Sequence, residues 1–105
     1  CYIDDAVEAM RMTMDHPSTD GPEIHTFHIG DREEILMRDL AEKMFDVTGW
    51  HPEKKTINPS PEGSVKRRLA DITKIQKIIG WEPKIKLVDG LKATYEWYAA
   101  NPKPE

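Results

Sequence analysis

The sequence predicts a small α/β unit in which helices are accompanied by a few short strands. Three observations predict it: apolar residues recur at helical spacing in four stretches, one stretch between them alternates, and glycine or proline marks most boundaries. The expected order is helix, strand, helix, strand, helix, helix, which is typical of α/β architectures. A length of 105 residues allows one domain.

The first third of the chain predicts a strand end, a helix and a strand. Tyr2-Ile3 is expected to end a strand, and Asp4 and Asp5 are good N-cap residues because a carboxylate accepts hydrogen bonds from free backbone N–H groups. The helix that follows stops before Pro17. Residues 23–29 carry apolar side chains on both faces, which favours an internal strand. The apolar stripe of the helix is Ile3, Val7, Met10 and Met14.

The middle third predicts one helix, a short strand and a polar loop. The helix is expected from about residue 35 to residue 48, with Gly49 ending it as a left-handed C′ residue. Residues 55–57 are a strand candidate, and a loop rich in Pro, Ser and Gly follows over residues 58–64. The buried stripe of this helix is expected to be Met37, Leu40, Ala41 and Met44.

The last third predicts two helices. Asp71 is expected to cap a short helix, Gly80 to end it and Pro83 to prevent its continuation. Trp81 is expected to fold back on the isoleucine face of this helix, and a final helix is expected over residues 87–100. The two stripes are Ile72, Ile75, Ile78 and Ile79, and then Leu87, Leu91, Thr94, Tyr95 and Tyr98.

Charge and composition narrow the classes of partner. Fifteen Lys and Arg against nineteen Asp and Glu leave a net charge of −4, which argues against a nucleic-acid or membrane-surface binder. No apolar run approaches the roughly 18 residues of a membrane span, and no signal peptide is recognised. The single cysteine, Cys1, excludes an internal disulfide framework and fits a cytoplasmic location. Because the sequence opens without Met inside a structural element, we expect a piece of a longer chain.

The familiar catalytic and cofactor motifs are missing from this sequence. It has no Gly-x-Gly-x-x-Gly motif, phosphate loop or Gly-x-Ser-x-Gly elbow, and no Tyr is followed four residues later by Lys. His25 and His28 would point to opposite faces of a strand. The acidic clusters at residues 4–5 and 31–34 are interpreted as helix-start residues that complement the helix dipole. We therefore expect no catalytic, cofactor-binding or metal-binding residue in this chain.

One basic cluster indicates a binding site. Lys66, Arg67 and Arg68 follow residues 61–64, Pro-Glu-Gly-Ser, and precede the Asp71 cap. The planar guanidinium of Arg bonds phosphate oxygens through two parallel N–H groups, so this loop could hold a diphosphate. A solvated basic loop that balances the acidic surface explains the same residues equally well.

A family resemblance runs nearly from end to end of the chain. Its segments are Tyr2-Ile3-Asp4-Asp5-Ala6-Val7, Phe27-His28-Ile29-Gly30, residues 67–74, Gly80-Trp81-Glu82-Pro83 and residues 87–98. In this order and spacing they resemble the C-terminal part of the NAD-dependent epimerase/dehydratases, which are extended short-chain dehydrogenases/reductases that modify sugar nucleotides. His28 stands where the family usually has Asn.

The resemblance implies a division of labour. The chain would be the small C-terminal substrate-binding domain of such an enzyme, with helices and a few short strands. Residues 1–17 would be a strand-helix segment of a Rossmann domain that is missing here, and residues 18–105 the nucleotide-sugar-binding domain. In the family, the Rossmann domain binds NAD or NADP and carries the Tyr/Lys catalytic pair. This chain alone is therefore expected to be inactive.

The resemblance also assigns substrate-binding residues. Arg68 best matches the family's arginine that binds the substrate diphosphate, and Arg67 is next. Glu62 is the third candidate for substrate binding, and it lies in a Pro-Glu-Gly sequence where many members have Arg-Pro-Gly-Asp. This departure puts UDP-glucose 4-epimerase in doubt, and the Pro-Glu-Gly form looks more like GDP-fucose synthases and GDP-mannose 3,5-epimerases.

Several alternatives stay open. The expected partners are a nucleotide-sugar substrate and the protein's own N-terminal Rossmann domain, while a homodimer is undecided. A non-enzymatic module that binds a nucleotide or another protein is the main alternative. A nucleic-acid contact is disfavoured by the acidic balance; it would use Lys54, Lys55, Lys66, Arg67 and Arg68.

Overall fold

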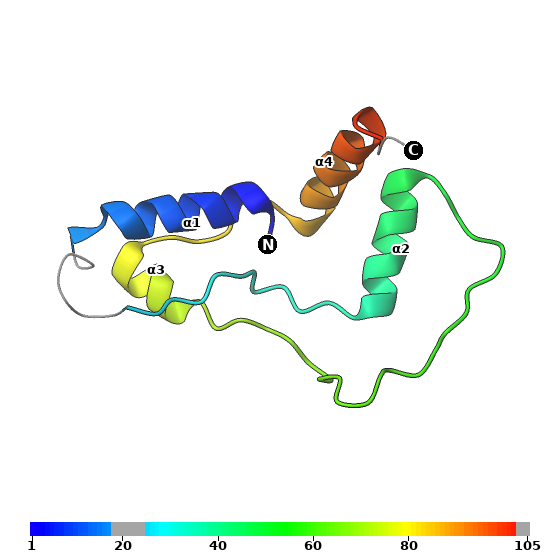
Figure 1. Cartoon of the computed structure of the whole chain (residues 1–105), viewed down its shortest axis with the longest axis horizontal. Helices are drawn as coiled ribbons and strands as arrows, with labels where there is room; N and C mark the ends of the chain where they lie inside the picture. Colours follow the sequence, from blue (N-terminus) through cyan, green and yellow to red (C-terminus); the bar gives the residue numbers. More distant parts are fainter. Residues whose placement is uncertain (18–24, 103–105) are drawn as a thin grey trace.

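The computed structural model describes residues 1–17 and 25–102. This part of the chain contains four α-helices: α1 (Ile3–Asp15), α2 (Met37–Thr48), α3 (Thr73–Ile79) and α4 (Leu87–Ala100). Figure 1 shows α1 and α3 at one end of the molecule and α2 beside α4 at the other, joined by long irregular connections. All four helices predicted from the sequence are therefore confirmed.

No β-strand forms within residues 1–17 and 25–102. Tyr2 is extended, but Ile3 already belongs to α1, so the predicted strand end at these residues is wrong. The predicted strands at residues 25–29 and 55–57 are not confirmed, and residues 23–24 lie outside the described part. A strand needs a neighbouring strand to pair its backbone N–H and C=O groups. Residues 25–29 instead run along α3, and residues 55–57 lie in the long exposed connection (Figure 1).

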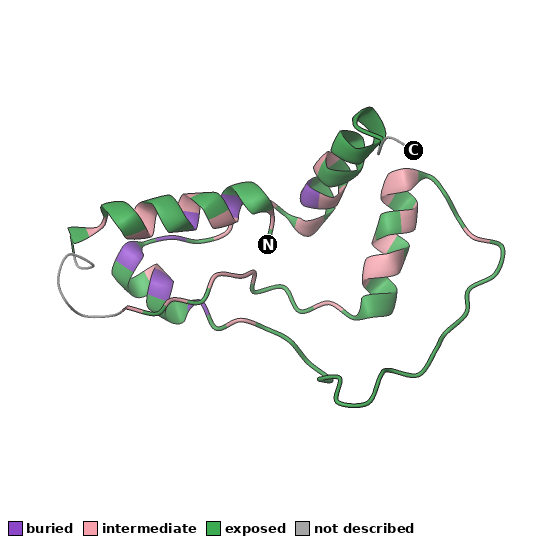
Figure 2. Ribbon diagram, in the orientation of Figure 1, coloured by how far each residue is buried: buried purple, intermediate pink, exposed green. Residues whose placement is uncertain are grey.

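The hydrophobic core lies between α1 and α3. Trp81 is only 2% exposed and packs with the isoleucines of α3, as the sequence predicted. Figure 2 shows that the buried residues concentrate on α1, on α3 and on the segments that flank α3. Phe27 and Ile29 cover the edge of this cluster from the connection that precedes α2. The buried cluster is Ala9, Ile72, Ile75, Ile79 and Trp81.

The apolar stripe of α1 is not the face that the structure buries. Ile3, Val7, Met10 and Met14 are between 54% and 80% exposed, whereas Ala9 is fully buried against α3. The small side chain of Ala9 fits among the larger side chains of this buried cluster, where a larger residue would have no room. The predicted apolar stripe of α1 is therefore left uncovered within the described part of the chain.

Parts of the other two predicted stripes are also exposed. Leu40 and Ala41 of α2 are half-buried as predicted, but Met37 and Met44 are exposed. Leu87 and Leu91 of α4 are half-buried, whereas the more C-terminal members of its stripe are exposed. These helices contact each other and few other elements, so only part of each apolar face is covered. The exposed residues of α4 are Thr94, Tyr95 and Tyr98, and Trp97 is exposed as well.

Glycines end two helices in the predicted way. Gly49 has φ of 69° and donates its N–H to the carbonyl of Phe45, and Gly80 has φ of 77° and closes α3. Both conformations lie in the left-handed region, which favours glycine because it has no Cβ. At the start of α3, Asp71 accepts a hydrogen bond from the Thr73 N–H at 2.9 Å, but the N-cap residue is Ile72 and no side chain caps the helix, so the predicted capping role of Asp71 is not confirmed. Hydrogen bonds from Thr73 hold the pKa of Asp71 below its usual value.

No helix in the described part of the chain has the length and apolar character that a membrane crossing requires.

Candidate functional site

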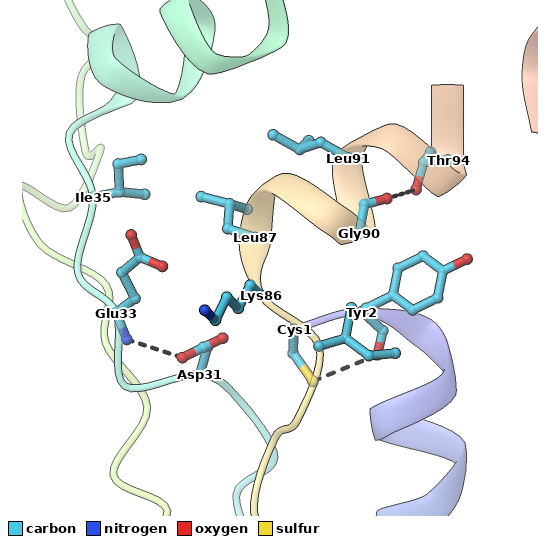
Figure 3. Close-up of a pocket in the computed structure, with 11 residues that line it drawn as sticks. Cys1, Tyr2, Asp31, Glu33, Ile35, Lys86, Leu87, Gly90, Leu91 and Thr94 are labelled. Atoms are coloured by element: carbon cyan, nitrogen blue, oxygen red, sulfur yellow. Dashed lines mark hydrogen bonds between the residues drawn. The ribbon is translucent and has the colours of Figure 1, made fainter. Parts of the chain in front are cut away.

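A pocket of about 240 Å³ lies where the start of α1 meets the start of α4. Its walls come from three segments: the first residues of the chain, the connection before α2, and residues 85–94. Figure 3 shows their side chains around a common space. We call it the α1–α4 pocket. Its lining includes Tyr2, Asp31, Glu33, Lys86, Leu87 and Leu91.

Two contacts hold the walls of this pocket together. Gly90 is buried on α4, and a Cβ added there would lie 3.1 Å from Cδ2 of Tyr2, so glycine lets α4 rest on the tyrosine ring. Close by, the Asp5 carboxylate accepts hydrogen bonds from the backbone N–H groups of Lys84 at 3.1 Å and Ile85 at 2.9 Å. The sequence predicted Asp5 as an N-cap of α1, but no side chain caps that helix. Asp5 instead lies in the first turn and bonds the segment before α4.

The charges that line the pocket have mixed signs. Lys86 brings one ammonium group, and Asp31 and Glu33 bring two carboxylates; Figure 3 shows the lysine side chain directed toward the two acids. The Asp31 carboxylate also accepts the Glu33 backbone N–H at 3.0 Å. Because acids outnumber bases, the pocket suits a neutral group with hydroxyl donors better than a dianion. Apolar walls from Leu87 and Leu91 complete it.

Arg67 is held next to this pocket by an ion pair. Its guanidinium donates two hydrogen bonds of 2.6 Å to the carboxylate of Glu34, which lies between the pocket residues Glu33 and Ile35. The arginine lowers the pKa of Glu34, and the carboxylate raises the pKa of Arg67. Arg67 is therefore already engaged by a side chain of the chain itself.

Arg68 and Glu62 are placed differently from Arg67. Both are exposed, and neither takes part in a hydrogen bond or ion pair within residues 1–17 and 25–102. The three predicted substrate-binding residues thus do not converge into one preformed site. Arg67 pairs with Glu34, whose chain neighbours line the pocket, while Arg68 keeps its N–H groups available to a ligand within the described part of the chain.

Sequence reasoning missed the pocket residues. The acidic cluster at residues 31–34 was interpreted as the start of a helix, but α2 begins only at Met37, so that interpretation is wrong. Lys86 belongs to no motif, and Tyr2 belongs only to a segment that carries the family resemblance; the packing of α4 on Tyr2 is what brings them together. A usable signal was Gly90, which has no turn to make inside α4 and therefore marks a close approach. Within the described residues, no group of three or more His, Cys, Asp or Glu could hold a metal ion.

Comparison with known proteins gives relatives for almost the whole chain. It is 34% identical over 100 residues to a probable GDP-L-fucose synthase 1 of Oryza sativa subsp. japonica, and 33% identical over 100 residues to GDP-L-fucose synthase 1 of Arabidopsis thaliana. These matches cover 95% of this chain but 29% of each relative. UDP-glucuronic acid decarboxylase 5 of Arabidopsis thaliana is 35% identical over 91 residues, which are 87% of this chain and 25% of that protein.

The chain thus spans less than a third of the length of the curated relatives it matches. No family model matches it, and no solved structure gives a significant match.

Proposed function

Because this chain is homologous to the C-terminal part of NAD-dependent epimerase/dehydratase enzymes, we propose that it is the segment of a nucleotide-sugar enzyme that holds the substrate. In this proposal the chain binds an activated sugar and positions it for chemistry that another segment carries out. Binding energy from a remote group of the substrate, such as its diphosphate, can then be used to orient the reacting sugar carbon.

The different engagement of Arg67 and Arg68 is the observation that carries this proposal. Glu34 pairs with Arg67 and fixes the basic loop against the connection that lines the α1–α4 pocket. Arg68, the next residue, keeps its guanidinium free within the described part of the chain. We propose that Arg68 binds the diphosphate, that Arg67 supports the loop, and that Glu62 accepts hydrogen bonds from donors on the nucleotide-sugar.

The mixed charge of the α1–α4 pocket supports a second part of the proposal. Asp31 and Glu33 can accept hydrogen bonds from hydroxyl groups, and Lys86 can donate to a hydroxyl or carbonyl oxygen. We propose that the pocket takes the neutral, hydroxyl-bearing part of the ligand. The relatives suggest two probes, since some are GDP-L-fucose synthases and others UDP-glucuronic acid decarboxylases. The Pro-Glu-Gly sequence that includes Glu62 favours the GDP-sugar.

The exposed stripe of α1 supports a contact with a further domain. One face of the helix buries Ala9 against α3, while Ile3, Val7, Met10 and Met14 form an exposed apolar row on another face. The radius of gyration is 17.6 Å, against about 13 Å for a compact chain of 100 residues. We propose that residues 1–17 pack against a Rossmann domain of the enzyme through this row. Residues 18–105 then bind the substrate.

A nicotinamide cofactor belongs to that further domain in our proposal. None of the four helices described here begins at a glycine-rich turn, so these residues do not form a dinucleotide cradle. NAD or NADP, when bound by the enzyme, would supply hydride transfer. The role of this chain is to bind and orient the sugar, and we expect no turnover by the chain alone.

Titration of the 105-residue chain with GDP-L-fucose and with UDP-glucuronic acid tests the proposal. We expect Arg68→Gln to weaken binding roughly tenfold, because a charge-assisted hydrogen bond to phosphate is lost. Lys66→Gln is the matched control, since it removes the same charge from the same loop. Equal affinity of Arg68→Gln and the unchanged chain would refute the assignment. Binding of GDP alone as tightly as GDP-L-fucose would favour a nucleotide-binding module.

A further inference from the structure

Asp5 is a buried charged residue whose side chain bonds a distant segment. Its side chain is on α1, only 6% of the residue is exposed, and Oδ2 accepts hydrogen bonds from the N–H groups of Lys84 and Ile85. A buried carboxylate is costly unless hydrogen bonds satisfy it, and bonds from two backbone N–H groups to one charged oxygen are stronger than neutral ones. This contact therefore constrains both segments.

The contact lies directly behind the α1–α4 pocket. Residues 84 and 85 immediately precede Lys86 and Leu87, and Ile85, Lys86 and Leu87 all line the pocket. On the other side, Cys1 and Tyr2 at the start of α1 line the same pocket. The Asp5 carboxylate thus connects two of the three walls. Rotation of residues 84–86 away from α1 would require both hydrogen bonds to break.

We propose that Asp5 is a positioning residue, which clamps the segment before α4 onto α1 and so sets where Lys86 and the first turn of α4 stand in the pocket. The second contact between these walls, Tyr2 against Gly90, is apolar and gives α4 a surface to rest on without fixing residues 84–86. The identity of the ligand in the pocket rests on the proposed function. The contact of Asp5 with residues 84 and 85 does not depend on that function.

Amide hydrogen exchange in the 105-residue chain tests the clamp without a ligand. Asn at position 5 keeps the shape of the side chain, but it loses the charge and turns part of the acceptor into an N–H₂ donor. In Asp5→Asn we expect the amides of Lys84 and Ile85 to exchange at least about tenfold faster, while amides of α2 keep their rates. The NMR shifts of Leu87 and Gly90 should move as well. Asp4→Asn, an exposed neighbour with the same charge change, should do neither.

Two results would overturn the positioning role. Unchanged exchange at Lys84 and Ile85 would show that the two hydrogen bonds do not hold the segment. Equal acceleration across α2, α3 and α4 would show that Asp5 only adds global stability. The same measurement on Asp5→Glu decides the matter if Asp5→Asn does not fold, because Glu keeps the carboxylate but displaces it by one methylene. There we expect faster exchange confined to residues 84 and 85.

A binding cycle separates this inference from the proposed function. With GDP-L-fucose as the probe, Asp5→Asn as the single substitution should weaken binding. In a chain that already carries Lys86→Met, adding Asp5→Asn should not weaken binding further. Additive effects in the two backgrounds would contradict positioning through Lys86. If the probe does not bind the unchanged chain, the proposed function fails, while the exchange rates still decide the clamp.

Discussion

Gly30, in the segment before α2, lies in close contact with Ala70, in the segment before α3. A Cβ built on Gly30 would lie 2.7 Å from the Cβ of Ala70, nearer than two such atoms can pack. Gly30 follows Phe27 and Ile29, and Ala70 precedes Ile72, so this approach brings the two flanking segments onto the same core. Packing thus explains the glycine of the Phe-His-Ile-Gly sequence, because Ala70 leaves no room for a Cβ at position 30.

Gly30→Ala is expected to destabilise the chain by about 1–3 kcal/mol, because the added methyl group has no room and the backbone must shift. Urea unfolding followed by circular dichroism measures the change. The double variant Gly30→Ala with Ala70→Gly removes the opposing Cβ and should recover much of the loss. A single variant as stable as the unchanged chain would show that the approach is looser than 2.7 Å implies.

Arg67→Gln is expected to raise the pKa of Glu34 toward 4.5, since the guanidinium is what lowers it. A carboxyl group with a lowered pKa in the folded state stabilises the fold above its unfolded pKa, and this contribution is lost as the pH falls through the folded pKa. In the unchanged chain the stabilisation from ionised Glu34 is therefore lost below about pH 4.5. The variant lacks this stabilisation, so its stability does not change with the protonation of Glu34. Carboxyl titration by NMR checks both.

Asp71 serves as the internal control for that titration. Its lowered pKa comes from hydrogen bonds at Thr73 and not from Arg67. Its titration should stay unchanged in Arg67→Gln, and a shift of both groups would point to a general change of fold. Thr73→Val, in contrast, should raise the pKa of Asp71 while Glu34 keeps its own.

Substitutions on opposite faces of α1 are expected to differ in their effect. Met10→Lys on the exposed row should change the free energy of unfolding by less than about 0.5 kcal/mol. Ala9→Leu should destabilise the chain by about 1–3 kcal/mol, because Ala9 is fully buried against α3 and larger side chains do not fit. Denaturant unfolding of the two variants compares the faces. The opposite ranking would mean that the apolar stripe, and not Ala9, faces the core.

Removal of Trp81 is expected to have the largest effect on stability. Trp81→Ala should cost about 3–5 kcal/mol, which is enough to unfold a chain with so small a core. Trp97→Ala is the matched control, because that side chain is 59% exposed and should change stability little. Near-ultraviolet circular dichroism and thermal unfolding distinguish the two. Comparable losses would show that the core extends to α4.

The local signals in the sequence were sufficient for the helices. Periodic apolar residues located all four, and the requirement for a left-handed residue at Gly49 and Gly80 located two of their ends. Trp81 was placed correctly because a bulky aromatic residue next to a helix end has few apolar surfaces within reach. The resemblance to a family rested on similar short segments, and the homologous enzymes confirm it.

The buried face of each helix and the pocket could not be obtained in the same way. A periodic stripe shows that a helix has an apolar face but not which partner covers it: in α1 the core takes Ala9, and the stripe stays exposed within the described residues. The role of Asp5 depends on two N–H groups about eighty residues away, which no local pattern reveals. Strands failed for a similar reason, since their hydrogen bonds lie in another segment.

The sequence by itself therefore determined the helices, their glycine ends and the family, because these depend on neighbours along the chain. Only the tertiary structure decided that Arg67 is paired while Arg68 has no partner among residues 1–17 and 25–102, and that Lys86 faces Asp31 and Glu33. Those relationships depend on distances between segments that are far apart in sequence. They are settled by which small residues, such as Ala9, Gly30 and Gly90, let the backbones come together.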